Sequence, residues 1–187
     1  PKENFIFEPN VRDVGPAVAK ACAIVGKDAP DVPVAIVWSA HCVKKERRFR
    51  EVLDIAKRLV EENKERLILI GQRARFANQN IGWIEFGQEV KEIKGTKIFR
   101  FKRLAYRPNL EEAEQFLKSN TFAWNPGYFV TTPKFLLSQY AKFAPNLYRG
   151  FMKIQHELGT PRFEEVLEEV YPHLEKVSFD NAILEKM

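Results

Sequence analysis

The segment from residue 124 to residue 130 reads Trp-Asn-Pro-Gly-Tyr-Phe-Val and places one polar amide, Asn125, just before an apolar run. The Pro-Gly pair that includes Gly127 indicates a turn, and the Tyr-Phe-Val run is typical of a buried strand. A carboxamide both donates and accepts hydrogen bonds, so Asn125 at the mouth of a strand could bind a ligand rich in hydroxyl groups, such as a sugar. The alternative is an asparagine that only stabilises its own turn.

His41 and Cys42 follow another apolar run and could suggest a base beside a nucleophile. Adjacent residues of a strand point to opposite faces of a sheet, which argues against such a pair. A lone histidine is more often a hydrogen-bonded structural residue than a catalyst.

Positive charges concentrate in three short stretches of the sequence, which are typical of anion-binding surfaces. Arg73 and Arg75 occupy a polar segment, residues 72–79, that lies between two strand-like runs. The other two stretches contain Lys44, Lys45, Arg47, Arg48 and Arg50, and then Arg100, Lys102 and Arg103. Nucleic-acid binding is a weaker interpretation that needs these charges to gather on one face, and we expect no nucleic-acid partner.

The hydrophobic pattern predicts strands alternating with amphipathic helices. The uniformly apolar run Val34–Trp38 predicts a central strand, because strands of parallel sheets are covered on both faces. Apolar residues repeat with helical spacing from Lys45 to Asn63, and Leu67–Ile70 predicts the next strand. This order predicts a right-handed crossover and an α/β fold with a mostly parallel sheet and helices on both faces.

Turn and capping residues delimit the remaining elements. Gly15-Pro16 begins, and Gly26 ends, a predicted helix at residues 17–25. Asn109 predicts the N-cap of a helix at residues 110–117. Strands are further predicted at residues 4–7, 81–86, 90–93 and 97–101, and helices at residues 135–143, 147–158, 163–170 and 179–186.

Composition predicts one domain over residues 1–187, with neither a membrane span nor a secretory leader. The 30 Lys and Arg against 25 Asp and Glu give a net charge of +5, a modest excess that suits a phosphate-bearing ligand. Two cysteines, Cys22 and Cys42, provide neither a metal-binding spacing nor a disulfide framework. A reducing, cytoplasmic setting is therefore expected.

Several segments, taken in order, resemble the mannose-1-phosphate guanylyltransferases, a branch of the sugar nucleotidyltransferases. The family reads Glu-Pro-x-x-Arg-Asn-Thr-Ala/Gly-Pro-Ala, Pro/Trp-Ala/Ser-Asp-His, Gly-Tyr-Ile, Glu-Lys-Pro, Trp-Asn-x-Gly-x-Phe and Ser-Ile-Asp-Tyr-Ala-x-x-Glu-Lys. The matching segments here are Glu8–Ala17, Trp38–His41, Gly82–Ile84, Tyr106–Pro108, Trp124–Phe129 and Ser178–Lys186.

This resemblance implies a Rossmann-like nucleotidyltransferase sheet and transfer of a guanine nucleotide to a sugar phosphate with Mg²⁺. Arg12 and Asp180 match residues with catalytic roles, and Asp180 also matches a metal-binding position. Asp180 as an ordinary helix cap is an equally weighted alternative. The matching substrate-binding positions are Gly82, Arg107, Asn125, Gly127, Glu185 and Lys186.

The chain departs from the family pattern at several of these positions. Ala40 replaces the metal-binding aspartate that precedes the histidine, Tyr106 replaces a glutamate, and Asp13-Val14 replaces Asn-Thr. Arg107 can still bind a phosphate in place of the family's lysine.

The resemblance also implies that segments of the family pattern lie outside this chain. The family's Gly-rich phosphate loop would precede residue 1, and its later aspartate motif would follow Met187. We therefore expect a partial domain, truncated at its N-terminus, with negligible activity alone. A second copy, a rearranged local segment or, as the preferred choice, a partner chain is expected to cover an open sheet edge. A non-catalytic, natural or engineered binding or assembly protein on the same fold is the alternative.

Overall fold

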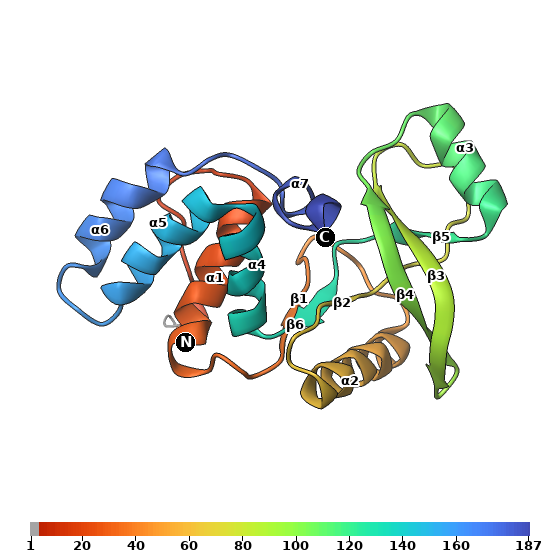
Figure 1. Cartoon of the computed structure of the whole chain (residues 1–187), viewed down its shortest axis with the longest axis horizontal. Helices are drawn as coiled ribbons and strands as arrows, with labels where there is room; N and C mark the ends of the chain where they lie inside the picture. Colours follow the sequence, from red (N-terminus) through yellow and green to blue (C-terminus); the bar gives the residue numbers. More distant parts are fainter. Residues whose placement is uncertain (1–3) are drawn as a thin grey trace. The chain divides into compact units, whose positions relative to one another are not determined.

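The computed structural model describes residues 4–187, which divide into two compact units (Figure 1). The first unit comprises residues 4–32 and 132–186 and is helical, and the second comprises residues 33–131 with Met187 and contains the strands. That residues 1–187 form one partial domain remains a prediction. Each unit is described by itself.

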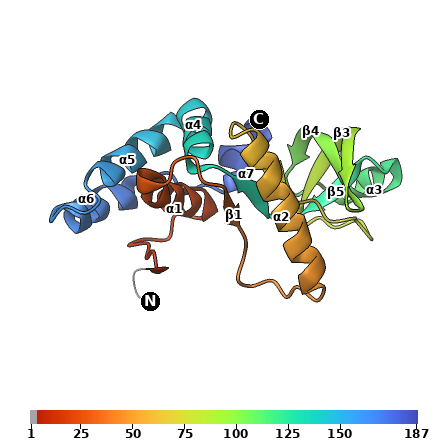
Figure 2. The same ribbon diagram turned by 90° about the horizontal axis from the view of Figure 1, so that it is seen from below.

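The first unit is built from helices, of which α1, α4 and α5 lie side by side (Figures 1 and 2). Its elements are α1 (Val14–Asp28), α4 (Pro133–Phe143), α5 (Pro145–His156), α6 (Phe163–Val170), η2 (Tyr171–His173), α7 (Phe179–Ala182) and η3 (Leu184–Lys186). The predicted helices from residue 135 onward are confirmed to within a few residues, except that residues 179–186 form two short helices. Thr132 caps α4 by accepting from the Phe135 N–H at 3.2 Å.

Two predictions for the start of this unit are wrong. Helix α1 continues through Gly26 because that glycine serves close packing: an added Cβ would lie 2.9 Å from the Pro133 Cβ atom. Residues 4–7 form no strand, and Phe5 and Phe7 are 65% and 77% exposed. A β-prone run needs a neighbouring strand to pair with, and none is present there in the described part of the chain.

The second unit contains a sheet in the order β1–β6–β2, formed by β1 (Val34–Ile36), β6 (Phe129–Thr131) and β2 (Ile68–Leu69). Helix α2 (Glu46–Glu62) packs on this sheet with Ile55, Ala56, Leu59 and Val60 buried, as predicted. Strand β6 lies between the other two and is antiparallel to both.

A second sheet of this unit has the order β4–β3–β5 and is also antiparallel. Strands β3 (Gly82–Ile93) and β4 (Thr96–Ala105) form a long hairpin, and β5 (Phe122–Asn125) pairs with β3. Lys94 and Gly95 have φ values of 48° and 71°, which suits a two-residue hairpin turn. Helix α3 (Leu110–Ser119) begins with the predicted cap, because Asn109 and Glu112 form a reciprocal capping box.

The described strand pairs are all antiparallel, so a mostly parallel sheet is not confirmed. The prediction that Val34–Trp38 forms a central strand is wrong within this sheet, because β1 lies at its edge with Ala35 and Val37 exposed. The physical reason is that β6, from a segment almost 100 residues later, pairs between β1 and β2. Helices on both faces of the sheet remain a prediction.

Candidate functional site

Asn125 ends β5 in a turn that its own side chain stabilises. Its Oδ1 atom accepts a hydrogen bond from the Gly127 N–H at 3.0 Å, and the residue is 6% exposed. Gly127 has a φ of 80°, a conformation that favours glycine. The turn-stabilising role is therefore observed, and it fixes the orientation of the amide at the end of the strand.

Gly82 lies directly across the sheet from Asn125, in the register of β3 with β5. A Cβ atom added at Gly82 would lie 3.5 Å from Asn125 Nδ2 and 3.4 Å from Asn125 Cβ. A side chain at Gly82 would therefore be in contact with the Asn125 amide. Three predicted substrate-binding residues, Gly82, Asn125 and Gly127, are thus brought together.

Arg107 lies at the same end of this sheet. Ala105 at the end of β4 pairs with Trp83, so the chain leaves the sheet beside Gly82 and reaches Arg107 two residues later. Arg107 is exposed, and its guanidinium carbon lies 5.2 Å from the centroid of the Tyr106 ring. A guanidinium that lies over an aromatic ring leaves the N–H groups along its own edge available for a phosphate.

The loop after β1 contacts the Asn125 turn. His41 Nδ1 and the Tyr128 hydroxyl are 2.6 Å apart, and the two rings meet edge to face. Trp38 lies against Gly127, because a Cβ added there would be 2.2 Å from Trp38 Nε1. Ala40 is exposed in this loop.

The sequence interpretation assigned no role to Trp38 or Tyr128, although both belong to the site. Tyr128 is buried, which raises the pKa of its phenol and keeps it available as a neutral hydrogen-bonding partner of His41. No local sequence signal identifies Trp38, because its contact with Gly127 joins residues 89 positions apart.

These segments together provide an amide, a guanidinium and two glycine backbones at one end of the sheet. An amide and backbone N–H and C=O groups can bind sugar hydroxyls, and the guanidinium can bind a phosphate oxygen pair. Gly82 and Asn125 are buried, whereas Gly127 is half-buried and Arg107 is exposed. His41 is engaged by Tyr128 rather than by a nucleophile. Cys42 is exposed, whereas Cys22 lies buried in the first unit, where burial raises the pKa of its thiol to about 12.

Arg12, predicted as catalytic, lies in the first unit, where it forms hydrogen bonds with backbone groups of Pro172 and Val177. Its guanidinium donates to the Pro172 carbonyl oxygen, and its own carbonyl accepts from the Val177 N–H at 3.4 Å. Its Nε atom is buried with no hydrogen-bond partner within the described residues.

Asp180, Glu185 and Lys186 lie near the C-terminal end of the same unit. Ser178 caps α7 by accepting from the Asn181 N–H, so Asp180 stands in the first turn and the alternative that it is the cap is wrong. Asn181 donates to Glu185 at 2.7 Å, and Lys186 donates to the Phe143 carbonyl at 3.1 Å.

Residues 4–187 contain no group of three or more His, Cys, Asp or Glu side chains arranged to hold a metal ion. Mg²⁺ is commonly held by one or two carboxylates together with substrate phosphates, so the predicted Asp180 contact stays a prediction.

Comparison with known proteins decides the family. The model described as "Nucleotidyl transferase" matches residues 1–159, which is most of the chain. The chain belongs to the nucleotidyl transferase family. It is 24% identical over 184 residues to the mannose-1-phosphate guanylyltransferase of Klebsiella pneumoniae and 26% identical over 187 residues to that of Escherichia coli K12. Each match covers 98% of this nucleotidyl transferase chain, but only 38% and 39% of the relatives.

Solved structures show the same fold. A Thermus thermophilus protein described as a mannose-1-phosphate geranyltransferase gives a TM-score of 0.82 at 24% identity, covering 97% of this chain and 49% of that one. A Helicobacter pylori protein described as a mannose-6-phosphate isomerase gives 0.79 at 22% identity, covering 97% and 67%. The α/β nucleotidyltransferase-like fold is therefore confirmed. Within residues 4–187, no helix has both the length and the apolar character that a membrane crossing requires.

Proposed function

We propose that this nucleotidyl transferase chain binds a sugar phosphate, with mannose 1-phosphate as the substrate, as part of a guanylyltransferase that forms GDP-mannose. The observation that carries the proposal is the meeting of Gly82, Asn125, Gly127 and Arg107 at one end of the β4–β3–β5 sheet. The names of the similar bacterial proteins support the choice of sugar.

In the proposed reaction, a phosphate oxygen of the sugar phosphate attacks the α-phosphorus of GTP. A new P–O bond forms as the bond to the β-phosphate oxygen breaks, and pyrophosphate leaves. Asn125 would orient the sugar hydroxyls, and Arg107 would bind the sugar's phosphate. A magnesium ion would neutralise charge on the reacting phosphates.

A binding experiment tests the sugar-phosphate site. Asn125→Asp keeps the oxygen that accepts from Gly127 but replaces the donor amide, so mannose 1-phosphate binding measured by calorimetry should weaken about tenfold or more. Asn63→Asp is the matched control, because Asn63 Oδ1 accepts from the Glu65 N–H in the same geometry at the exposed end of α2. Unchanged affinity in Asn125→Asp, or equal losses in both variants, would remove Asn125 from the site.

Non-catalytic sugar-phosphate binding or assembly is the second candidate function. It is favoured by the exposed alanine at position 40, in the loop where the family resemblance implies a metal-binding carboxylate. We therefore expect negligible pyrophosphate release from GTP, Mg²⁺ and mannose 1-phosphate with this chain alone. Ala40→Asp should not restore turnover by itself, and clear activity of the unmodified chain would contradict the expectation.

We also propose that a partner chain covers the open edge of β1. One side of β1 pairs with β6, and no strand within residues 4–187 pairs with its other side. Unpaired backbone groups that become buried cost about 1–3 kcal/mol each, so an added strand would stabilise this edge. Light scattering over a range of concentrations should show masses above that of one chain. A stable monomer at high concentration would contradict this proposal.

A further inference from the structure

Strand β4 lies at one edge of the β4–β3–β5 sheet and, with 10 residues, is the longest edge strand in the described part of the chain. Its inner side pairs with β3, and no strand within residues 4–187 pairs with its outer side. The four consecutive residues from Arg100 to Arg103 are exposed. An accessible edge presents backbone N–H and C=O groups with which an added strand can pair.

The two strands of the hairpin differ in charge. Strand β4 has four Lys and Arg and no Asp or Glu, whereas β3 has three Glu and one Lys. The cations of β4 are Lys97, Arg100, Lys102 and Arg103. Such an edge opposes pairing with a second copy of β4, because like charges would face each other, and it favours an acidic strand.

Carboxylates of β3 neutralise only part of this charge. Glu85 is shared between Lys102 at 3.3 Å and Arg103 at 2.7 Å, and Glu89 pairs with Lys97 at 2.9 Å. Two carboxylates therefore serve three cations. Among the described residues, no ion pair or side-chain hydrogen bond engages the fourth cation, Arg100. The edge consequently retains positive charge that can attract an acidic partner.

An apolar group adjoins the cationic edge. Phe101, between Arg100 and Lys102, is 37% exposed and pairs in register with Phe86. The rings of Phe86 and Phe99 pack against each other, with centroids 4.6 Å apart. A strand added beside β4 could therefore cover Phe101 with an apolar side chain while its acidic side chains pair with the cations.

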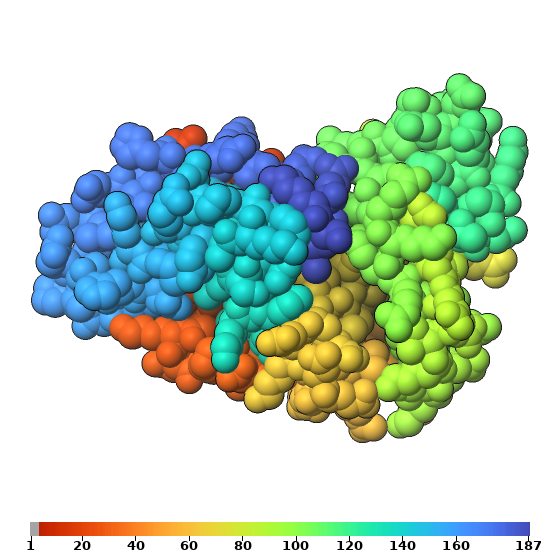
Figure 3. Space-filling model, viewed as in Figure 1, coloured from red at the N-terminus to blue at the C-terminus, as the bar shows by residue number. Residues whose placement is uncertain are grey.

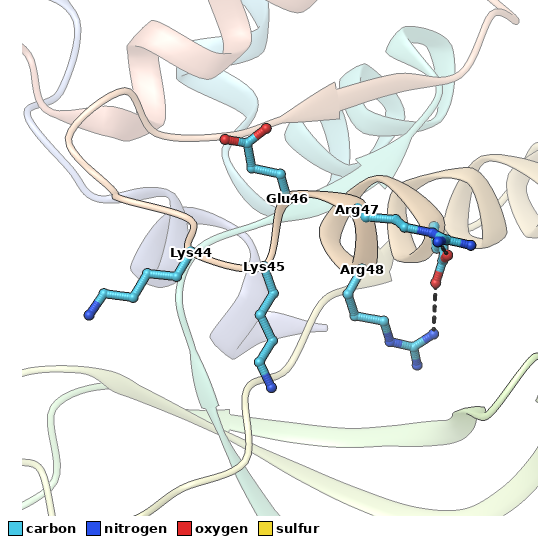
Figure 4. Close-up of a pocket in the computed structure, with 6 residues that line it drawn as sticks. Lys44, Lys45, Glu46, Arg47 and Arg48 are labelled. Carbon is cyan, nitrogen blue, oxygen red and sulfur yellow. Dashed lines mark hydrogen bonds and ion pairs between the residues drawn. The ribbon is translucent and has the colours of Figure 1, made fainter.

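Contacts with α2 hold the hairpin without using the middle of β4. Arg48, whose side chain extends away from α2 (Figure 4), donates to the Gly95 carbonyl at 3.1 Å and to the Thr96 hydroxyl at 2.7 Å. Lys91 of β3 pairs with Glu62 at 3.0 Å. An edge that is already held in place loses less conformational freedom when a partner binds. The surface of the hairpin is coloured yellow-green to green in Figure 3.

The length of an added strand is limited by the hairpin itself. The register between β3 and β4 shifts three times between Glu85 and Lys91. Such irregularities bend an edge, so an added strand can stay in register for only about four to six residues. The geometry therefore suits a short extended segment rather than a whole sheet.

We propose that the outer edge of β4 binds a short, extended, acidic segment of a partner protein by strand addition. Main-chain hydrogen bonds provide affinity in this mode, and the pairing of Asp or Glu with Arg100 and Lys102 provides specificity. A single-stranded nucleic acid fits less well, because it needs successive exposed rings, whereas Phe86 and Phe99 already pack on each other. The proposal does not depend on the proposed sugar-phosphate site.

Fluorescence anisotropy with a labelled synthetic peptide tests the proposal on the 187-residue chain. The probe has about seven residues, alternates Glu with Val, and has blocked ends. Arg100→Gln, Lys102→Gln should weaken its binding about tenfold or more. The matched control, Lys57→Gln, Lys118→Gln, removes the same charge from the same unit and should change affinity less than about twofold.

A second probe separates strand addition from simple charge attraction and needs no protein variant. Its central Val is replaced by Pro, which keeps the charge but removes a backbone N–H and cannot continue a strand ladder. We expect this probe to bind about tenfold more weakly or worse than the first. Equal binding of the two probes would exclude strand addition.

Three further results would overturn the proposal. One is the absence of binding of the Glu-Val probe, and another is an equal loss of affinity in the two double variants. The last is tighter binding of a single-stranded oligonucleotide of about twenty nucleotides that depends on Arg100 and Lys102, which would make this edge a nucleic-acid site instead.

Discussion

Replacing Gly127 with alanine is expected to lower the free energy of unfolding of the second unit by about 2–5 kcal/mol. Gly127 has a φ of 80°, and this left-handed conformation costs a residue with a Cβ atom about 1–2 kcal/mol. The new Cβ would also lie 2.2 Å from Trp38 Nε1 and 3.0 Å from Trp38 Cε2, so the indole must move. Such overpacking adds about 1–3 kcal/mol.

Gly95→Ala separates these two causes. Gly95 also has a positive φ, 71°, but a Cβ added there meets nothing within 4 Å in the described structure. We expect it to cost only about 1–2 kcal/mol. Urea denaturation followed by tryptophan fluorescence measures both variants, because Trp38, Trp83 and Trp124 all lie in residues 33–131. Equal losses in the two variants would show that the Trp38 contact contributes nothing.

The Gly127 variant should also weaken sugar-phosphate binding. The Gly127 N–H holds Asn125 Oδ1, so a displaced turn would move the amide that we propose as the sugar ligand. Gly95 lies at the far tip of the hairpin from this end of the sheet, and its variant should retain binding.

Replacing Lys20 with alanine is expected to destabilise the first unit by about 2–5 kcal/mol, the cost of truncating a large buried side chain. Lys20 is 2% exposed, and its Nζ atom donates to the Phe7 carbonyl oxygen. The same atom lies 5.3 Å from the centroid of the Tyr171 ring, whose hydroxyl donates to Glu8. The alanine variant would leave a cavity and remove the donor that holds the segment around Phe7.

Lys20→Met distinguishes packing from charge. Methionine refills most of the volume, so we expect a loss below about 1.5 kcal/mol. Far-UV circular dichroism during urea denaturation follows the loss of helix, and most of the helical residues belong to this unit. A loss in Lys20→Met as large as that in Lys20→Ala would show that the ammonium group, rather than the buried stem, dominates.

The contribution of Lys20 to stability depends on pH, and the direction follows from its pKa shift. Burial lowers the pKa of Lys20 below 10.5, and Glu8 and Glu164 oppose that shift. Between the folded-state pKa and 10.5 the unfolded chain binds more protons, so the contribution of Lys20 to stability rises with pH and is least favourable at neutral pH. The free energy of unfolding of Lys20→Met minus that of the unmodified chain should therefore be higher at neutral pH than near pH 10.5. The opposite trend would contradict the role assigned to burial.

Elements made by neighbouring residues could be predicted from the sequence. The α3 cap depends on Asn109 and Glu112, three residues apart, and the hairpin depends on a turn at Lys94 and Gly95. The amphipathic spacing of α2 likewise shows which face is buried. Local hydrogen bonds and side-chain periodicity contain this information, so no distant residue was needed to decide it.

The candidate site was predicted in part for the same reason. The turn at Asn125 and Gly127 could be identified from a Pro-Gly pair, whereas the position of Gly82 opposite Asn125 follows from strand register. The family resemblance predicted Gly82 and Arg107 as substrate-binding residues. Only the pairing of β3 with β4 and β5 brings them to the end of one sheet.

Sheet order was decided by tertiary structure alone. The run Val34–Trp38 is apolar enough for a central strand, yet β1 lies at an edge of the β1–β6–β2 sheet. Likewise, nothing near Gly127 in the sequence indicates that Trp38, 89 positions earlier, fills the space beside it. Hydrophobicity determines that a strand is buried, but the choice of its neighbours depends on backbone hydrogen bonds and side-chain packing between distant segments, which exist only once the chain has folded.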